Sequence, residues 1–222
     1  KLDVGSIVQG GNTNLTVKLT RLWPDFKTPL TVQLHPLEGI PNVAVNNGGP
    51  MTLNPGKDEV KVPVAVNAQA TPGTYNLVLR GTGQIPFNKD PKAKQKPPIN
   101  VIQPATPVAL TVLPKQVATV TVTNPNPAVK AGSQSEVVVR VARQYQYTGP
   151  FQVKLVLPKG TTGVAAADIT IPAGKDEGRL MLKVPANTPP GNRPNVVVQL
   201  TAILPGNVAV VQEAKLNVIV RK

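Results

Sequence analysis

The sequence contains one internal duplication, and this feature constrains the fold more than any other. Four landmarks recur in the same order, about 120 residues later in the chain. They are Leu30–Leu34 and Phe151–Leu155, Gly56–Glu59 and Gly174–Glu177, Thr71–Gly73 and Thr188–Gly191, and Ile99–Ile102 and Leu216–Ile219. The 222 residues therefore hold two copies of a unit of ordinary domain size. We predict domains at residues 1–104 and 105–222, joined near residues 103–107 by a connector that two prolines stiffen.

Within each unit, apolar and polar residues alternate over short segments. This period of two is typical of antiparallel strands that have one buried and one solvated face. The segments with the clearest alternation are residues 15–20, 30–34, 60–66, 75–79, 137–141, 151–157 and 196–200. Turn-forming residues separate them, drawn from the 25 Pro and 18 Gly of the chain. We predict an all-β chain made of two tandem immunoglobulin-like antiparallel β-sandwich domains.

One proline falls inside a predicted strand. Pro63 occupies an outward position of the segment 60–66, and proline has no N–H to donate to a strand ladder. We therefore predict that this strand lies at the edge of a sheet.

The order of these motifs resembles a known kind of protein. An alternating strand leads to an aromatic-containing loop, a strand after a proline, a Gly-Lys-Asp-Glu turn, a Thr-Pro-Gly turn and a final apolar-Asn-Val-Ile segment. This pattern resembles the tandem immunoglobulin-like modules of large exported bacterial proteins, which are repeated in long polypeptides of the planctomycete type. The resemblance covers both units and implies a fold and an exported setting. It carries over no functional residue.

The inventory of reactive side chains argues against an enzyme. The chain has no cysteine, a single histidine and 11 acidic residues. The histidine, His35, falls at an outward position at the end of a predicted strand, and both a catalytic triad and a zinc site need partners that it lacks. We therefore predict no catalytic residue, no cofactor and no bound metal.

Two repeated turns carry adjacent carboxylates, Asp58 with Glu59 and Asp176 with Glu177. Such pairs can contribute to calcium sites, which use about 6 to 8 oxygen ligands. Each turn supplies only two side-chain carboxylates, next to a lysine. We favour a hairpin turn in which glycine adopts an unusual backbone conformation and the charges keep the tip in solvent.

Aromatic side chains are few, and most of them fall in two corresponding loops. Trp23 and Phe26 lie between the second and third predicted strands of the first unit, and Tyr145 and Tyr147 lie there in the second. Exposed rings in such loops could stack on sugars, which makes these four residues candidate ligand-binding residues. The alternative is that the rings close the end of each sandwich. Closure is favoured for the first pair, and both interpretations stay open for the tyrosines.

The net charge of +13 is compatible with an anionic partner. Lysines cluster in one proline-rich stretch, residues 88–98, which makes them a candidate anion-binding site. They are Lys89, Lys92, Lys94 and Lys96. No aromatic residue interleaves with them, so we predict no specific nucleic-acid binding. The favoured alternative is a mobile, solvated hairpin loop.

Together these features predict a non-catalytic structural spacer or adhesive interaction module of a larger bacterial protein. We expect it to be secreted, on the cell surface or in the periplasm, without membrane insertion. Its expected partners are other domains of the same polypeptide, with surface glycans or other proteins as further candidates. A carbohydrate-binding accessory module that uses the loop aromatics is one alternative. A two-domain periplasmic chaperone is another, although such chaperones have dissimilar domains and the duplication argues against it.

Overall fold

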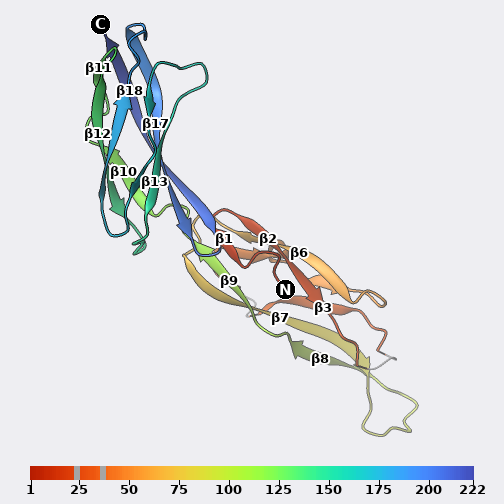
Figure 1. Ribbon diagram of the computed structural model, residues 1–222. Helices are drawn as coiled ribbons and strands as arrows, with labels where there is room; N and C mark the ends of the chain where they lie inside the picture. Colours follow the sequence, from red (N-terminus) through yellow and green to blue (C-terminus); the bar gives the residue numbers. More distant parts are fainter. Residues whose placement is uncertain (23–25, 36–38) are drawn as a thin grey trace. The chain divides into compact units, whose positions relative to one another are not determined.

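Figure 1 shows the computed structural model of the chain, which describes residues 1–22, 26–35 and 39–222. The chain divides into two compact units, Lys1–Lys115 (unit 1) and Gln116–Lys222 (unit 2). Each unit is a sandwich of two β-sheets. The described residues contain no α-helix, and their one helical element is the 3-10 turn η1 (Asn46–Gly48). The predicted all-β fold with immunoglobulin-like sandwiches is confirmed.

Unit 1 has a small sheet and a larger one. The small sheet has the order β2–β6–β4, and the larger has the order β1–β9–β7–β3–β5, with β8 also paired to β7. The small sheet is built from β2 (Asn12–Lys18), β4 (Val43–Val45) and β6 (Glu59–Val66). The larger sheet is built from β1 (Ser6–Val8), β3 (Leu30–His35), β5 (Met51–Leu53), β7 (Gly73–Pro86), β8 (Pro98–Pro104) and β9 (Val108–Leu113).

Unit 2 repeats this arrangement with the sheet orders β10–β12–β16–β14 and β11–β18–β17–β13–β15. The first sheet is built from β10 (Ala118–Val122), β12 (Gln134–Arg143), β14 (Ala165–Ala166) and β16 (Glu177–Lys183). The second is built from β11 (Ala128–Lys130), β13 (Phe151–Val156), β15 (Ile169–Ile171), β17 (Gly191–Leu204) and β18 (Val208–Arg221). Strand β10 is additional, and its place in unit 1 is taken by one bridge between Leu2 and Leu15.

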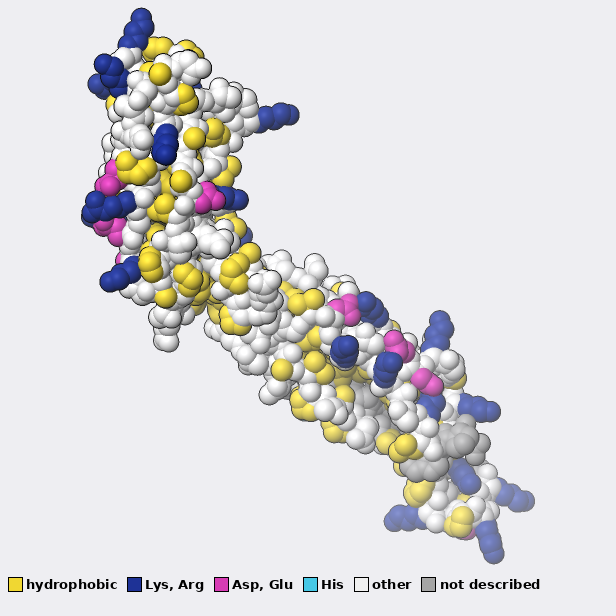
Figure 2. All heavy atoms as spheres, in the orientation of Figure 1, with side chains coloured by type: hydrophobic (Ala, Val, Ile, Leu, Met, Phe, Trp, Pro, Cys, Tyr) yellow, Lys and Arg dark blue, Asp and Glu magenta, His cyan; other side chains and the backbone are white. Residues whose placement is uncertain are grey.

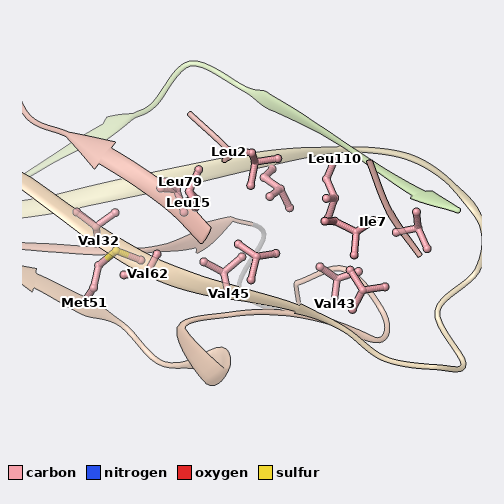
Figure 3. Close-up of a cluster of buried hydrophobic side chains, with 14 of the residues drawn as sticks. Leu2, Ile7, Leu15, Val32, Val43, Val45, Met51, Val62, Leu79 and Leu110 are labelled. Atoms are coloured by element: carbon pink, nitrogen blue, oxygen red, sulfur yellow. The ribbon is translucent and has the colours of Figure 1, made fainter. Parts of the chain in front are cut away.

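The inward residues of the alternating strands form the core of each unit. In β6 these are Val62, Val64 and Val66, all nearly inaccessible to solvent, and Figure 3 shows how such aliphatic side chains from both sheets of unit 1 meet. In unit 2 the largest fully buried side chain is Phe151 on β13. Burial of this apolar surface is the main force that holds the two sheets of a unit together.

The strand that contains Pro63 is not an edge strand, so that prediction is wrong. Strand β6 lies between β2 and β4. The short strand β4 pairs with β6 only from Val64 to Val66, so it stops before it reaches Pro63. Proline requires only that no neighbouring strand needs a hydrogen bond from its nitrogen, and the three-residue strand β4 is too short to lie beside it.

The boundary between the units lies later than residue 104. Strand β9 comes after the predicted boundary, yet it pairs with β7 and, in parallel, with β1. It therefore belongs to unit 1. Residues 103–107, the predicted connector, instead lead from the end of β8 to β9 within that unit.

The misplaced boundary comes from one false match between the two copies. Val218 pairs with Arg193 on β17, and at the corresponding place on β7 Tyr75 pairs with Leu110. The counterpart of Val218 is therefore Leu110 in β9. Sequence matching assigns it to Val101, which lies in β8 and pairs with a later part of β7.

Candidate functional site

An arginine lies at the centre of a hydrogen-bond network in unit 1. Arg21 follows β2, in the connection that crosses to β3 in the other sheet. Its Nη1 donates to the carbonyl oxygens of Phe26 at 3.0 Å and Thr28 at 3.1 Å. Its Nη2 donates to the carbonyl of Asn54 at 3.5 Å, and its Nε pairs with Asp58 Oδ1 at 2.9 Å. The side chain thus joins the β2–β3 loop to the turn between β5 and β6.

Unit 2 contains the same network around Arg143, the last residue of β12. Nη1 donates to the carbonyls of Tyr147 at 3.4 Å and Gly149 at 2.6 Å. Nη2 donates to the carbonyl of Pro172 at 3.2 Å, and Nε pairs with Asp176 Oδ1 at 2.9 Å. These four groups occupy the same places in unit 2 as the four partners of Arg21 occupy in unit 1.

We call each network an arginine latch. Both guanidinium-bearing side chains are largely buried, with 13% of the Arg21 side chain and 14% of the Arg143 side chain exposed. Aromatic rings cover them, since Arg21 Cζ lies 5.2 Å from the ring centre of Phe26 and Arg143 Cζ lies 4.9 Å from that of Phe151. The planar guanidinium carries five N–H donors, which lets one side chain bind several carbonyls and a carboxylate together. Each latch therefore ties together two chain segments that cross between the sheets.

The repeated carboxylates face cations. Asp58 and Asp176 belong to the latches, while Glu59 pairs with Lys18 at 3.0 Å and Glu177 with Arg140 at 3.4 Å. Among the described residues, no group of three or more His, Cys, Asp or Glu side chains is arranged to hold a metal ion.

The glycine in each of these turns has the expected left-handed conformation, with φ of 80° at Gly56 and 71° at Gly174. That part of the prediction is confirmed. The turns are not hairpins, however, because β5 and β6, like β15 and β16, belong to different sheets. In both units this glycine-containing turn connects the two sheets of the sandwich.

The structure places the candidate aromatic residues in different roles. Tyr147 packs on Phe151 with ring centres 5.2 Å apart, and its hydroxyl donates to the carbonyl of Pro150 at 2.9 Å. Burial raises the pKa of Tyr147, and the positive charge of Arg143 partly opposes this. Tyr145 is 58% exposed. Phe26 packs in the latch, and Trp23 lies outside the described residues.

The lysine cluster lies in the loop that joins β7 to β8. Lys89, Lys92, Lys94 and Lys96 are all exposed, and Figure 2 shows basic side chains gathered at this end of unit 1. The loop has internal hydrogen bonds, since Asn88 Nδ2 donates to the carbonyl of Gln95 at 2.9 Å. The lysines are brought together, and anion binding by them stays a prediction.

His35 is exposed at the end of β3, as expected from its position. A hollow of about 340 Å³ lies over β13, β15 and β17 of unit 2, and polar side chains such as Lys154, Asp168 and Thr201 line it. Among the described residues, no helix is long and apolar enough to cross a membrane.

Comparisons with known proteins return structural neighbours only. No family model matches the chain, and no curated protein sequence matches it. Similar solved structures include domains 4 and 5 of the S-layer protein SbsC, with 14% identity over 71% of this chain and 69% of that one and a TM-score of 0.34.

Others are the fibronectin(III)-like modules of Clostridium thermocellum CbhA and an I-band fragment of titin. The CbhA modules are 13% identical over 100% of this chain and 93% of that one, with a TM-score of 0.37. The titin fragment is 10% identical over 100% of this chain and 64% of that one, with a TM-score of 0.37. At such identities the likeness concerns the fold alone.

Proposed function

We propose that the chain is a non-catalytic spacer that carries tension within a larger secreted or cell-surface bacterial protein and holds its other domains apart. The observation that carries this proposal is that the last strand of each unit pairs in parallel with a strand from the first part of that unit. Strand β1 pairs in parallel with β9, which ends unit 1, and β11 pairs in parallel with β18, which ends unit 2.

Parallel pairing of these strands decides how a unit responds to pulling. Force that reaches these strands from opposite ends of a unit draws the parallel neighbours past each other along their axes. In unit 2 it reaches β11 only after β10. The hydrogen bonds between the parallel neighbours, such as Gln9 N–H to the Leu113 carbonyl at 2.9 Å and Ala131 N–H to the Arg221 carbonyl at 2.9 Å, then carry the force together. Bonds loaded together resist better than bonds opened one after another.

Single-molecule force spectroscopy on the chain, pulled by its ends, tests this proposal. We expect two unfolding events, each releasing roughly 300 Å of chain. The variant Ala131→Pro removes the N–H that bonds to Arg221, so it should lower the unfolding force of one event and leave the other unchanged.

The matched control is Val153→Ala, which weakens the core of unit 2 at a fully buried position away from the parallel pair. At equal loss of thermal stability, it should lower the unfolding force less than Ala131→Pro. Equal losses of force in the two variants would show that the parallel pair is not the mechanical element, and the proposal would be abandoned.

A glycan-binding function is the second candidate, because Tyr145 is largely exposed on a loop. Tyr145 and Gln146 both have positive φ, 51° and 56°, so a tight turn holds the ring out from the sheet. A glycan array with the chain and its Tyr145→Ala variant tests this. Binding that the substitution abolishes would establish a glycan-binding module in place of a spacer.

A further inference from the structure

Strand β8 is an edge strand with an unusual surface. Among the described residues it pairs with β7 and with no other strand (Figure 1). All of its residues are exposed. Three of them are large and apolar, with exposed fractions of 38% for Ile99, 41% for Val101 and 55% for Ile102. Phe87, just beyond the paired end of β7, is 47% exposed. An exposed edge with apolar side chains is a template for the addition of another strand.

The hydrogen bonds at the two ends of β8 show which backbone groups are available. Phe87 N–H donates to the carbonyl of Pro97 at 3.0 Å, and Ala105 N–H donates to the carbonyl of Leu79 at 2.7 Å. Both bonds fall at odd-numbered positions of this segment. Because bonding and non-bonding positions alternate in an antiparallel pair, the odd-numbered residues of β8 face β7 and the even-numbered residues face away.

The outward positions are Pro98, Asn100, Ile102 and Pro104. Only Asn100 and Ile102 have an N–H, because proline has none. The free edge therefore offers two donors in its middle and none at either end. An added strand can therefore form hydrogen bonds with β8 only over this short stretch, because the prolines at the two ends offer no further N–H donors.

The charge next to this edge selects among extended segments. The β7–β8 loop carries the four clustered lysines and one acidic residue, Asp90. Asp90 is occupied within the loop, where its Oδ1 accepts from Lys92 N–H at 2.9 Å. Figure 2 shows basic side chains around this end of unit 1. An anionic strand is attracted to this edge, and a cationic strand is repelled.

We propose that β8 accepts, as an added strand, a short extended segment of a partner protein in which apolar residues alternate with Asp or Glu. The backbone of that segment pairs with Asn100 and Ile102, its apolar side chains cover the exposed ones of β8, and its carboxylates lie beside the lysine loop. This interaction goes beyond the proposed spacer function and does not depend on it.

The test uses the full chain, labelled with ¹⁵N, and a capped ten-residue peptide of alternating Val and Glu. We expect chemical-shift changes at Asn100 and Ile102, slower amide exchange there, and weaker binding as salt is added. Asn100→Pro removes one of the two outward donors without touching the bonds to β7. It should bind the peptide about tenfold more weakly, whereas the matched control Asn100→Thr keeps the N–H and should bind within about twofold of the original chain.

Two further peptides separate strand addition from plain charge attraction. One is the Val-Glu peptide with N-methyl groups on alternate amides. The other consists of five Glu residues, so it has the same net charge as the Val-Glu peptide. Both should bind at least about tenfold more weakly than the Val-Glu peptide, because neither has both the backbone donors and the apolar face. Equal binding by either peptide, unchanged binding by Asn100→Pro, or no binding of the Val-Glu peptide at millimolar concentration would overturn the proposal.

Discussion

The last part of the larger sheet is built in two ways in the two units. In unit 2 a single strand, β18, pairs with β17 along its whole length, and a tight turn at Gly206 and Asn207, both with positive φ, closes the hairpin. In unit 1 the same place is filled by β8 and β9, with Pro107 between them and the long lysine loop before them (Figure 1). Unit 2 therefore ends in one continuous strand and unit 1 in two shorter ones, and the break in unit 1 falls at Pro107, after a longer loop.

The largest contrast between the units should lie in their cores. Phe151 is fully buried in unit 2, and Leu30, at the corresponding place in unit 1, is only partly buried. We expect Phe151→Ala to lower the free energy of unfolding of unit 2 by about 3 to 5 kcal/mol and Leu30→Ala to lower that of unit 1 by about 2 kcal/mol. Urea unfolding measures both. Trp23, the one tryptophan of the chain, makes fluorescence a signal from unit 1.

The arginine latches should contribute next. Replacement of Arg143 by Met leaves several carbonyls and Asp176 without their donor, at a cost of about 2 to 3 kcal/mol. Arg21→Met should cost somewhat less, because its Nη2 contact is longer. Lys at either place should not restore stability, since one ammonium cannot reach all of the partners. Full rescue by Lys in thermal unfolding would show that charge alone matters.

The lysine loop should contribute little to stability. Replacement of residues 88–96 by Asn-Gly shortens the hairpin toward the form seen in unit 2, and loop-closure entropy changes by about 0.6 kcal/mol per doubling of length. The melting temperature of unit 1 should therefore hardly change, while retention on a heparin column should fall. A clear drop in melting temperature would show that the loop packs against the sheet.

The smallest effect should come from the only histidine. His35 is exposed at the end of β3, so His35→Ala should change the free energy of unfolding by no more than about 0.5 kcal/mol. Thermal unfolding checks this, and a larger change would mean that the end of β3 holds unit 1 together in a way that has no parallel at the end of β13.

Strand positions could be predicted from the sequence because alternation reports directly which face is buried. Val62, Val64 and Val66 show this clearly. The boundary between the two units could not be predicted, because the sequence of an apolar-Asn-Val-Ile segment does not show which strand it pairs with. The segments around Val101 and Val218 are similar in sequence. Only their pairing with β7 and β17 shows that the two residues occupy different positions in their sheets.

The latches were missed for a related reason. Arg21 and Arg143 bind mostly backbone carbonyls. Every residue has a carbonyl, so the sequence does not show which ones an arginine binds. A signal was nevertheless present, since each arginine precedes an aromatic loop and each unit repeats an aspartate in its Gly-Lys-Asp-Glu turn. A basic residue and an acidic residue that both recur in a duplication are candidates for contact with each other.

Recognition of backbone also affects how the loops can change over evolutionary time. The latch needs carbonyl oxygens at set places, and any residue can supply one. The two copies already differ there, with Phe26 and Thr28 in one and Tyr147 and Gly149 in the other. The side chain at the position of Thr28 and Gly149 can therefore change while its carbonyl still binds the arginine, and new surface chemistry can arise there without loss of the fold, whereas Phe26 and Tyr147 both keep a ring beside the guanidinium.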